Sequence, residues 1–252
     1  MNDTLRTLFN HRSHKSFADR PVSAETVRTV AEAARSLPSW VNGQHVTIIE
    51  VRDEAVKGEL AALSGNQAHV AAAPVFLVFC MDLARAAYAA RQEGQPFEAD
   101  NDADAILVGA TDVGIQLGGA VAAAESLGLG TIPIGGIRRH TARVIELLEL
   151  PRHVFPLVGL CLGYPAGEPA QKPRLPLGLV LHEGKYQGID PELMEAYNAE
   201  YRTYTREHER TERSWTEIIA HFYGLNPRYG DAQDTLRRQG YSWGGAQEDE
   251  QR

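Results

Sequence analysis

Hydrophobic and polar positions along the chain predict helices and strands in turn. After Pro21 and Ser23, apolar residues recur at a 3.6-residue spacing from Val27 to Ala34, which predicts a helix beginning near Ser23. Residues 46–51 are β-branched enough to predict a strand. The other predicted elements are short helices around Leu5, Leu60 and Val144 and after Gln67, and strands over 75–79, 131–134 and 157–162. This alternation alone favours a doubly wound α/β fold.

Residues 102–127 predict one long helix that is apolar on nearly every face and rich in glycine and alanine. A helix of this kind should be buried, and its small residues permit close approach of a neighbouring helix. Burial in the core of one chain and packing across a dimer interface both fit the pattern. The number of glycines favours the dimer interface.

Composition and charge exclude some classes of function for this chain. The chain has 252 residues, of which 43% are hydrophobic and 23% charged, as in ordinary globular proteins. A formal net charge of −8 argues against nucleic acid or an anionic membrane as a partner. The longest apolar run, Val70 to Met81, contains Pro74 and is too short to span a bilayer. Cys80 and Cys161 lie in apolar segments without metal-type spacing, and no signal peptide is visible, so we expect buried thiols in the cytoplasm.

Two basic clusters stand out in this acidic chain, at 11–15 and at 172–174. Cations grouped in this way suit a phosphate. Gly135 and Gly136 follow a β-branched strand, where the missing side chains let a flat ligand approach the backbone. Each feature taken singly also fits a solvated charge run or a plain turn. Taken together they suggest a bound, phosphorylated planar cofactor and no metal.

The chain changes character after Arg174. Residues 191–213 are charged, carry tyrosines and predict a helical stretch. We therefore expect a core domain over 1–190, a C-terminal helical extension over 191–243 and a disordered tail over 244–252.

Several motifs, in order, resemble the nitroreductase/flavin reductase family, and more closely its oxygen-insensitive NADPH-type nitroreductases. They are His11-Arg12-Ser13, Ser39 with Gln44, Gly65-Asn66-Gln67, 125–130, Ile134-Gly135-Gly136, Gly163-Tyr164-Pro165 and 172–176. The resemblance covers about residues 5–190 and is weaker as far as Tyr241. It implies an α+β fold with a central mixed sheet flanked by helices, in an intertwined homodimer with FMN at the subunit interface. We prefer this fold to the doubly wound one because the strands carry no GxGxxG motif.

The resemblance also implies roles for individual residues. The residues expected at FMN are His11, Arg12, Ser13, Lys15, Ser39, Gln67, Ile134, Gly135, Gly136, Lys172 and Arg174. Those expected near NADPH and the acceptor are Trp40, Arg138, Arg206 and Arg228. Lys15 stands where relatives carry arginine, and either Lys15 or Lys172 would approach the N1–C2 edge of the flavin.

The implied activity is oxidoreductase chemistry carried by FMN, with no side chain as nucleophile. NADPH would deliver hydride, and a nitroaromatic, quinone or flavin acceptor would then take two electrons by a ping-pong mechanism. A flavin-binding sensor or carrier without fast turnover is the alternative function.

Overall fold

The computed structural model describes residues 1–224, 229 and 231–241. The chain forms two compact units, one of Met1–Glu168 with Tyr229–Arg252 and the other of Pro169–Arg228. The predicted tail over 244–252 and Arg228 lie outside the described residues. The domain boundaries expected from the sequence stay predictions.

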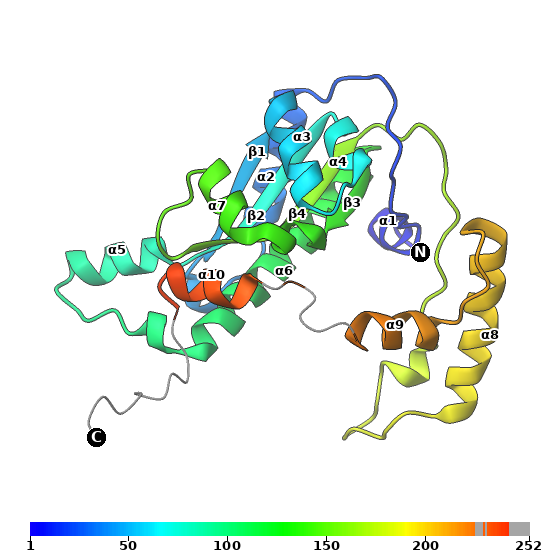
Figure 1. Cartoon of the computed structure of the whole chain (residues 1–252). Coiled ribbons are helices and arrows are strands. Elements are labelled where there is room, and N and C mark those ends of the chain that lie inside the picture. The colour runs from blue at the N-terminus through cyan, green and yellow to red at the C-terminus, as the bar shows by residue number, and fades with distance from the viewer. Residues whose placement is uncertain (225–228, 230, 242–252) are drawn as a thin grey trace. The chain divides into compact units, whose positions relative to one another are not determined.

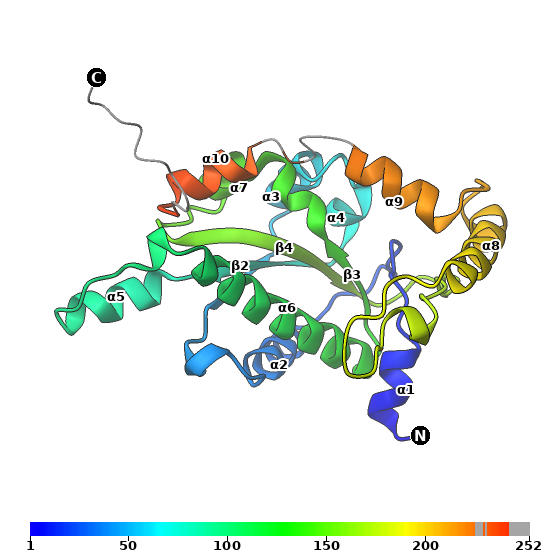
Figure 2. The ribbon, with the colours of Figure 1, turned by 90° about the horizontal axis from the view of Figure 1, so that it is seen from below.

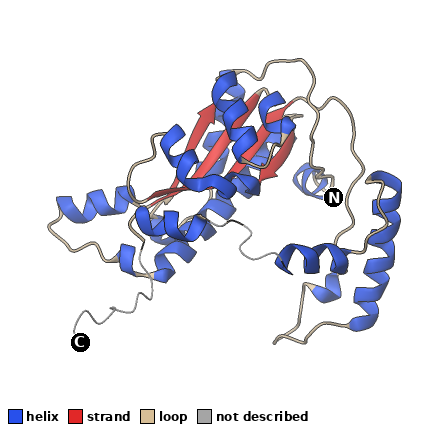
Figure 3. Cartoon of the chain, in the orientation of Figure 1, coloured by secondary structure: helices blue, strands red, loops and turns tan. Residues whose placement is uncertain are grey.

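The first unit is built on a four-stranded sheet in the order β1-β2-β4-β3 (Figures 1 and 3). The strands are β1 Val46–Val51, β2 Val75–Asp82, β3 Gly130–Ile134 and β4 Val154–Gly163. All three pairs of neighbouring strands are antiparallel. The expected mixed sheet is therefore wrong for the strands described, because each strand runs opposite to its neighbours. The one parallel pairing among the described residues is an isolated bridge between Ser13 and Thr131.

Helices cover both faces of this sheet, as Figure 2 shows. On one face lie α2 Ala24–Arg35 and α6 Ala103–Ser126, and on the other α3 Glu54–Leu63, α4 Ala68–Ala72 and α7 Thr141–Leu147. Every residue of β2 is buried, because that strand is central and covered on both sides. This explains why 75–81 reads as a continuous apolar run without alternation. The expected α+β class, with helices flanking a sheet, is confirmed.

Local sequence signals account for several element boundaries. The Ser23 side chain accepts a hydrogen bond from the Thr26 amide at 3.0 Å and caps α2 where the spacing predicted the helix start. Pro133 lies in β3, an edge strand, where a residue without an amide hydrogen is tolerated. The remaining helices of this unit are α1 Asp3–Phe9, α5 Ala84–Gln92 and α10 Ala232–Arg238. Of these, α5 is not predicted by the sequence pattern, whereas α10 lies within the stretch expected as a helical extension.

The long helix α6 is only partly buried in one chain. It is the one helix in the described part that is long and apolar enough to cross a membrane, by length and composition alone. Gly109 and Gly119 are packed inside the unit: a Cβ at Gly109 would lie 2.7 Å from the Met81 sulfur, and one at Gly119 would overlap Leu37. At Gly114 and Gly118 a Cβ would meet nothing within 4 Å. Two of the four glycines thus serve the chain's own core and two face outward.

The described part of the second unit, 169–224, contains three helical segments joined by loops, η4 Leu177–Leu179, α8 Pro191–His208 and α9 Trp215–Gly224. Asp190 caps α8 by accepting hydrogen bonds from the amides of Glu192 and Leu193, and Pro191 occupies the first helical position. The Tyr197 ring packs edge-on against Trp215, with ring centroids 6.0 Å apart. These aromatic contacts hold the two longer helices together.

Candidate functional site

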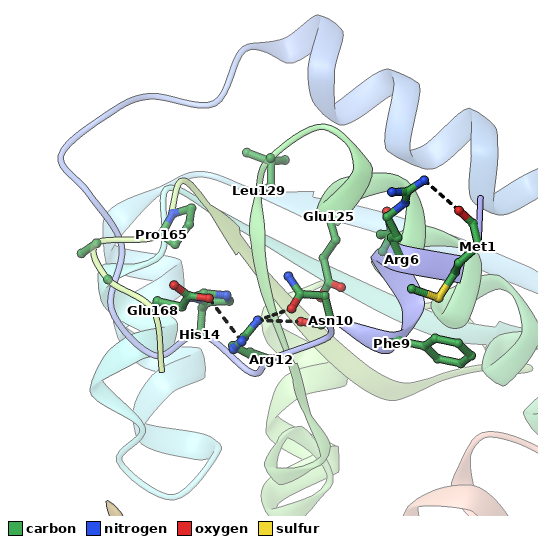
Figure 4. Close-up of a pocket in the computed structure, with 14 residues that line it drawn as sticks. Met1, Arg6, Phe9, Asn10, Arg12, His14, Glu125, Leu129, Pro165 and Glu168 are labelled. Atoms are coloured by element: carbon green, nitrogen blue, oxygen red, sulfur yellow. Dashed lines mark hydrogen bonds and ion pairs between the residues drawn. The ribbon is translucent and has the colours of Figure 1, made fainter. Parts of the chain in front are cut away.

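The N-terminal basic segment runs beside the start of β3 (Figure 4). The His14 amide donates to the Thr131 carbonyl at 2.8 Å, next to the Ser13–Thr131 bridge. The His14 ring packs so closely on Gly130 that a Cβ there would lie 2.7 Å from Cγ. Burial lowers the pKa of His14, and the nearby positive charge of Arg12 adds to this effect, against the opposing effect of Glu125. The segment is therefore fixed to the sheet and is not a free arm.

Glu125, in the last turn of α6, contacts both this segment and β3. One carboxylate oxygen, Oε1, lies 2.7 Å from His11 Nδ1 and accepts a hydrogen bond from the Thr131 hydroxyl at 2.8 Å. Both side chains of the His11–Glu125 pair are largely shielded from solvent. Glu125 belongs to the 125–130 motif, but its pairing with His11, 114 positions away, was not predicted from the sequence.

Within this segment, the cationic side chain of Arg12 borders a cavity. Its Nη1 donates to Asn10 Oδ1 at 2.6 Å, and its Nη2 lies 3.2 Å from Glu168 Oε1. Its Nε is buried and has no hydrogen-bond partner. The cavity beside it has a volume of about 970 Å³ and lies between α1, the C-terminal end of α6 and residues 165–168 (Figure 4). A buried, unpaired N–H on a guanidinium is a position for an anionic acceptor.

The glycine pair after β3 meets the end of α3. The Gln67 amide nitrogen donates to the Ser64 carbonyl at 2.7 Å. A Cβ at Gly136 would lie 2.5 Å from that nitrogen and closer still to the Ser64 oxygen. At Gly135, by contrast, a Cβ would meet nothing nearer than Arg138 Nη2 at 3.7 Å. Gly136 is thus required by packing, whereas Gly135 leaves its backbone open. Ile134, which precedes the pair, is buried in the core.

Lys15 and His69 extend the site toward α4. Burial lowers the pKa of His69, and the charge of Lys15 lowers it further. The Nε2 atom of His69 is buried and has no hydrogen-bond partner. The neutral imidazole therefore has an unsatisfied nitrogen close to an exposed cation. Ser64 carries a second unpaired buried atom, its hydroxyl oxygen, in the same region of α3 and α4.

Ser39 and Trp40 lie elsewhere on the first unit. The Trp40 amide donates to Asp112 Oδ1 at 3.1 Å, in the first half of α6. His11 contacts Glu125, at the end of that helix. The stretch of α6 from Asp112 to Glu125 spans about 20 Å at 1.5 Å per residue. Trp40 is therefore far along α6 from the N-terminal basic segment of its own chain. The place of Ser39 at FMN stays a prediction.

The arginines expected near the nicotinamide have separate environments. Arg138 Nη1 donates to the Leu157 carbonyl, and its guanidinium lies 5.3 Å from the centre of the Tyr229 ring. Arg206 belongs to the second unit and pairs with Glu212 at 3.4 Å. Arg228 lies outside the described residues. Their joint contact with a nucleotide stays a prediction.

Lys172 and Arg174 lie in the second unit, beside a cavity of about 540 Å³ that is lined also by Tyr197, Tyr201 and Trp215. Lys172 Nζ donates to Glu209 Oε1. Burial lowers the pKa of Lys172, but this hydrogen bond and the surrounding negative charge outweigh it, and the pKa is raised. Lys172 is therefore a cation at neutral pH. Its position at a common site with Arg12 stays a prediction.

The structure adds a buried pair that sequence analysis missed. His45 Nδ1 lies 2.8 Å from Asp112 Oδ2, and both residues are buried. The partners are 67 positions apart, so no local pattern could join them. One signal was available: an aspartate inside a long apolar helix needs a polar partner when it is buried.

The fold and the basic, glycine-bordered site define a class of α+β proteins suited to a phosphorylated planar ligand. The chain belongs to the nitroreductase family: the family's sequence profile matches residues 8–164, and the profile of its C-terminal domain matches 172–243. It is 43% identical to an FMN reductase [NAD(P)H] of Bacillus subtilis, covering 96% of this chain and 98% of the relative. It is 41% identical to an oxygen-insensitive NADPH nitroreductase of Salmonella typhimurium, covering 87% and 90%.

Solved structures agree with this assignment. The structure of NfrA2 from B. megaterium matches with a TM-score of 0.94 and 43% identity, over 96% of this chain and 99% of that one. An NADPH:FMN oxidoreductase from Vibrio harveyi, complexed with NAD+, matches with a TM-score of 0.86 and 33% identity, over 97% and 100%. The resemblance drawn from the motifs is confirmed.

Proposed function

We propose that the protein is an FMN-dependent oxidoreductase that takes hydride from NADPH and passes two electrons to nitroaromatic, quinone or flavin acceptors. Relatives that match nearly the whole chain are named as FMN reductases and NADPH nitroreductases. The observation that carries the proposal to this chain is Arg12, whose buried Nε lacks a partner beside a cavity large enough for a nucleotide-sized ligand. Two buried free thiols, Cys80 and Cys161, fit a reducing cytoplasm.

The residues present fit FMN. Arg12 would hold the phosphate, with the exposed Ser13 hydroxyl as a further donor and Lys15 as a second cation. Gly135, whose backbone is open, would border the ring. The Gln67 amide nitrogen is already engaged with Ser64, so its amide oxygen is the atom that it can offer to an N–H of the ring.

FMN, when bound, supplies reversible acceptance of two electrons, which no side chain of the chain can supply. The protein's part is to bind, to orient and to balance charge. Lys15 or Lys172 would place a cation at the N1–C2 edge, where it stabilises negative charge. Because NADPH and the acceptor would use one place in turn, we expect a ping-pong mechanism.

The functional unit of this proposal is a homodimer. Leu107 is 64% exposed in the single chain, and Gly114 and Gly118 on the same helix are open on their outer side. A second copy packed on this face of α6 would bury them. It would also supply Trp40, whose contact with Asp112 lies about 20 Å along α6 from the contact of Glu125 with its own basic segment. Sedimentation of a dimer at micromolar concentration is expected, and a monomer would contradict this part.

Initial-rate kinetics test the mechanism. NADPH and menadione, as a quinone acceptor, are varied together. Parallel double-reciprocal lines are expected, because one substrate leaves before the other binds. Intersecting lines would require both substrates to be bound together and would contradict the ping-pong order.

A further inference from the structure

Residues 39–44, here called the 39–44 loop, have a backbone that their sequence does not favour. Val41, Asn42 and Gln44 have φ angles of 43°, 58° and 53°, in the left-handed region. Asparagine tolerates this region, but a β-branched valine rarely adopts it. Three such residues within four positions form a strained segment. Strain of this kind persists only where the surroundings enforce it, and it gathers at functional sites.

A buried polar pair enforces this shape. Asp112 is 1% exposed and His45 is 6% exposed. One carboxylate oxygen of Asp112 contacts His45 Nδ1 at 2.8 Å, and the other accepts the Trp40 amide hydrogen at 3.1 Å. A single carboxylate therefore holds both ends of the strained segment.

The 39–44 loop packs around the imidazole ring of His45. Gly43 packs so tightly on the imidazole that a Cβ there would overlap the ring. The Trp40 ring lies beside the imidazole, tilted by 37° with centroids 6.3 Å apart. Inside the loop, the Gly43 amide donates to the Trp40 carbonyl at 2.7 Å and the Gln44 amide to Ser39 Oγ at 3.0 Å.

This arrangement leaves two large apolar side chains exposed. Trp40 is 59% exposed and Val41 is 75% exposed, although both are large and hydrophobic. A buried carboxylate in an apolar helix adds little net stability, since an apolar pair of similar volume often stabilises a fold as much. The pair and the strain are better explained by the presentation of Trp40.

We propose that Asp112 and His45 are positioning residues that hold Trp40 as one wall of the slot in which the nicotinamide and the acceptor bind. This inference rests on the proposed function. A rigid indole offers a face on which flat aromatic acceptors stack. The wall belongs to the site of a second copy, since Trp40 does not reach the basic segment of its own chain.

Two variants test the proposal from opposite directions. Asp112→Ala removes both acceptor oxygens, whereas His45→Gln keeps the carboxylate and removes the imidazole ring that Gly43 and Trp40 contact. Lys57→Met is the matched control: Lys57 is equally buried, donates to the Ala73 carbonyl at 2.6 Å and lies on α3, on the other face of the sheet. The control should lose stability without changing the loop.

The first readout needs no flavin. Hydrogen exchange of the FMN-free protein reports the amides of residues 40–44, and acrylamide quenching of Trp40, in a background with Trp215→Phe and Trp243→Phe, reports its indole. Both variants should exchange about tenfold faster at these amides, with higher quenching, because loop openings are no longer resisted. Lys57→Met should match the parent protein in both.

The second readout separates binding from turnover. In both variants the KM for nitrofurazone and for NADPH should rise about tenfold, while kcat changes by less than about twofold and FMN content is kept. Unchanged KM values, or unchanged exchange, in His45→Gln would overturn the proposal even where Asp112→Ala fails to fold. A parent protein whose FMN is not reduced by NADPH would instead refute the proposed function, while the exchange data would still report on the loop.

Discussion

Gly136 offers the sharpest test of how closely the chain after β3 packs against the end of α3, here called the glycine corner. In Gly136→Ala the new Cβ would lie 2.5 Å from the Gln67 amide nitrogen and closer still to the Ser64 carbonyl oxygen. Real Cβ atoms do not approach so near, so something must move. The Gln67 side chain can yield, but the Ser64 carbonyl is backbone at the end of α3 and cannot yield cheaply.

The expected cost follows from these two contacts. Overpacking of this kind costs about 1–3 kcal/mol. Loss of the 2.7 Å hydrogen bond between Gln67 and Ser64 adds about 1 kcal/mol. The total of about 2–4 kcal/mol should lower the Tm by roughly 5–15 °C in a chain of this size.

Thermal unfolding of the FMN-free protein, followed by circular dichroism, measures this cost without interference from the cofactor. The matched control is Gly58→Ala, in α3, where a Cβ would meet nothing within 4 Å and alanine should stabilise the helix by about 0.5–1 kcal/mol. If Gly136→Ala unfolds within 2 °C of the parent, on the order of the shift from 1 kcal/mol, the tight packing of this corner is refuted.

Three further predictions concern charge. Lys172→Ala combined with Arg174→Ala should strip FMN and abolish turnover, and a yellow holoprotein after purification would refute their placement at the cofactor. Glu125→Gln should cost about 1–2 kcal/mol in urea unfolding because it weakens two shielded hydrogen bonds, whereas Glu59→Gln, at an exposed pair, should leave the midpoint unchanged. The lowered pKa of His69 means that the unfolded chain binds a proton more readily, so its contribution to stability is present above about pH 6.5 and is lost as the pH falls below that value. His69→Asn should therefore lose less stability than the parent between pH 7 and 5, and equal losses would contradict the assignment.

Sequence periodicity sufficed for elements whose signals are local. The start of α2 follows from Ser23 and the spacing after it, and β2 follows from its apolar run. The pairing of the strands could not be predicted in the same way, because a strand's direction depends on residues far away in the chain. The expectation of a mixed sheet came from the resemblance and was wrong for the described strands.

The same difference between local signals and long-range contacts applies to the candidate site. His11 and Arg12 were found because they adjoin each other in sequence and stand out in an acidic chain. Their pairing with Glu125 and Glu168 could not be predicted, since only the fold brings a helix end and a distant loop to them. Asp112 carried a usable signal, because a buried charged residue in an apolar helix needs a partner, whichever residue that partner is.

The visible spectrum of the purified protein under argon, before and after one equivalent of NADPH, tests the central claim most directly. We expect bound-flavin absorption that bleaches within the mixing time and returns when an acceptor is added. Flavin that is bound but reduced only slowly would favour a sensor or carrier. A colourless protein that takes up no added FMN would contradict the account of the site.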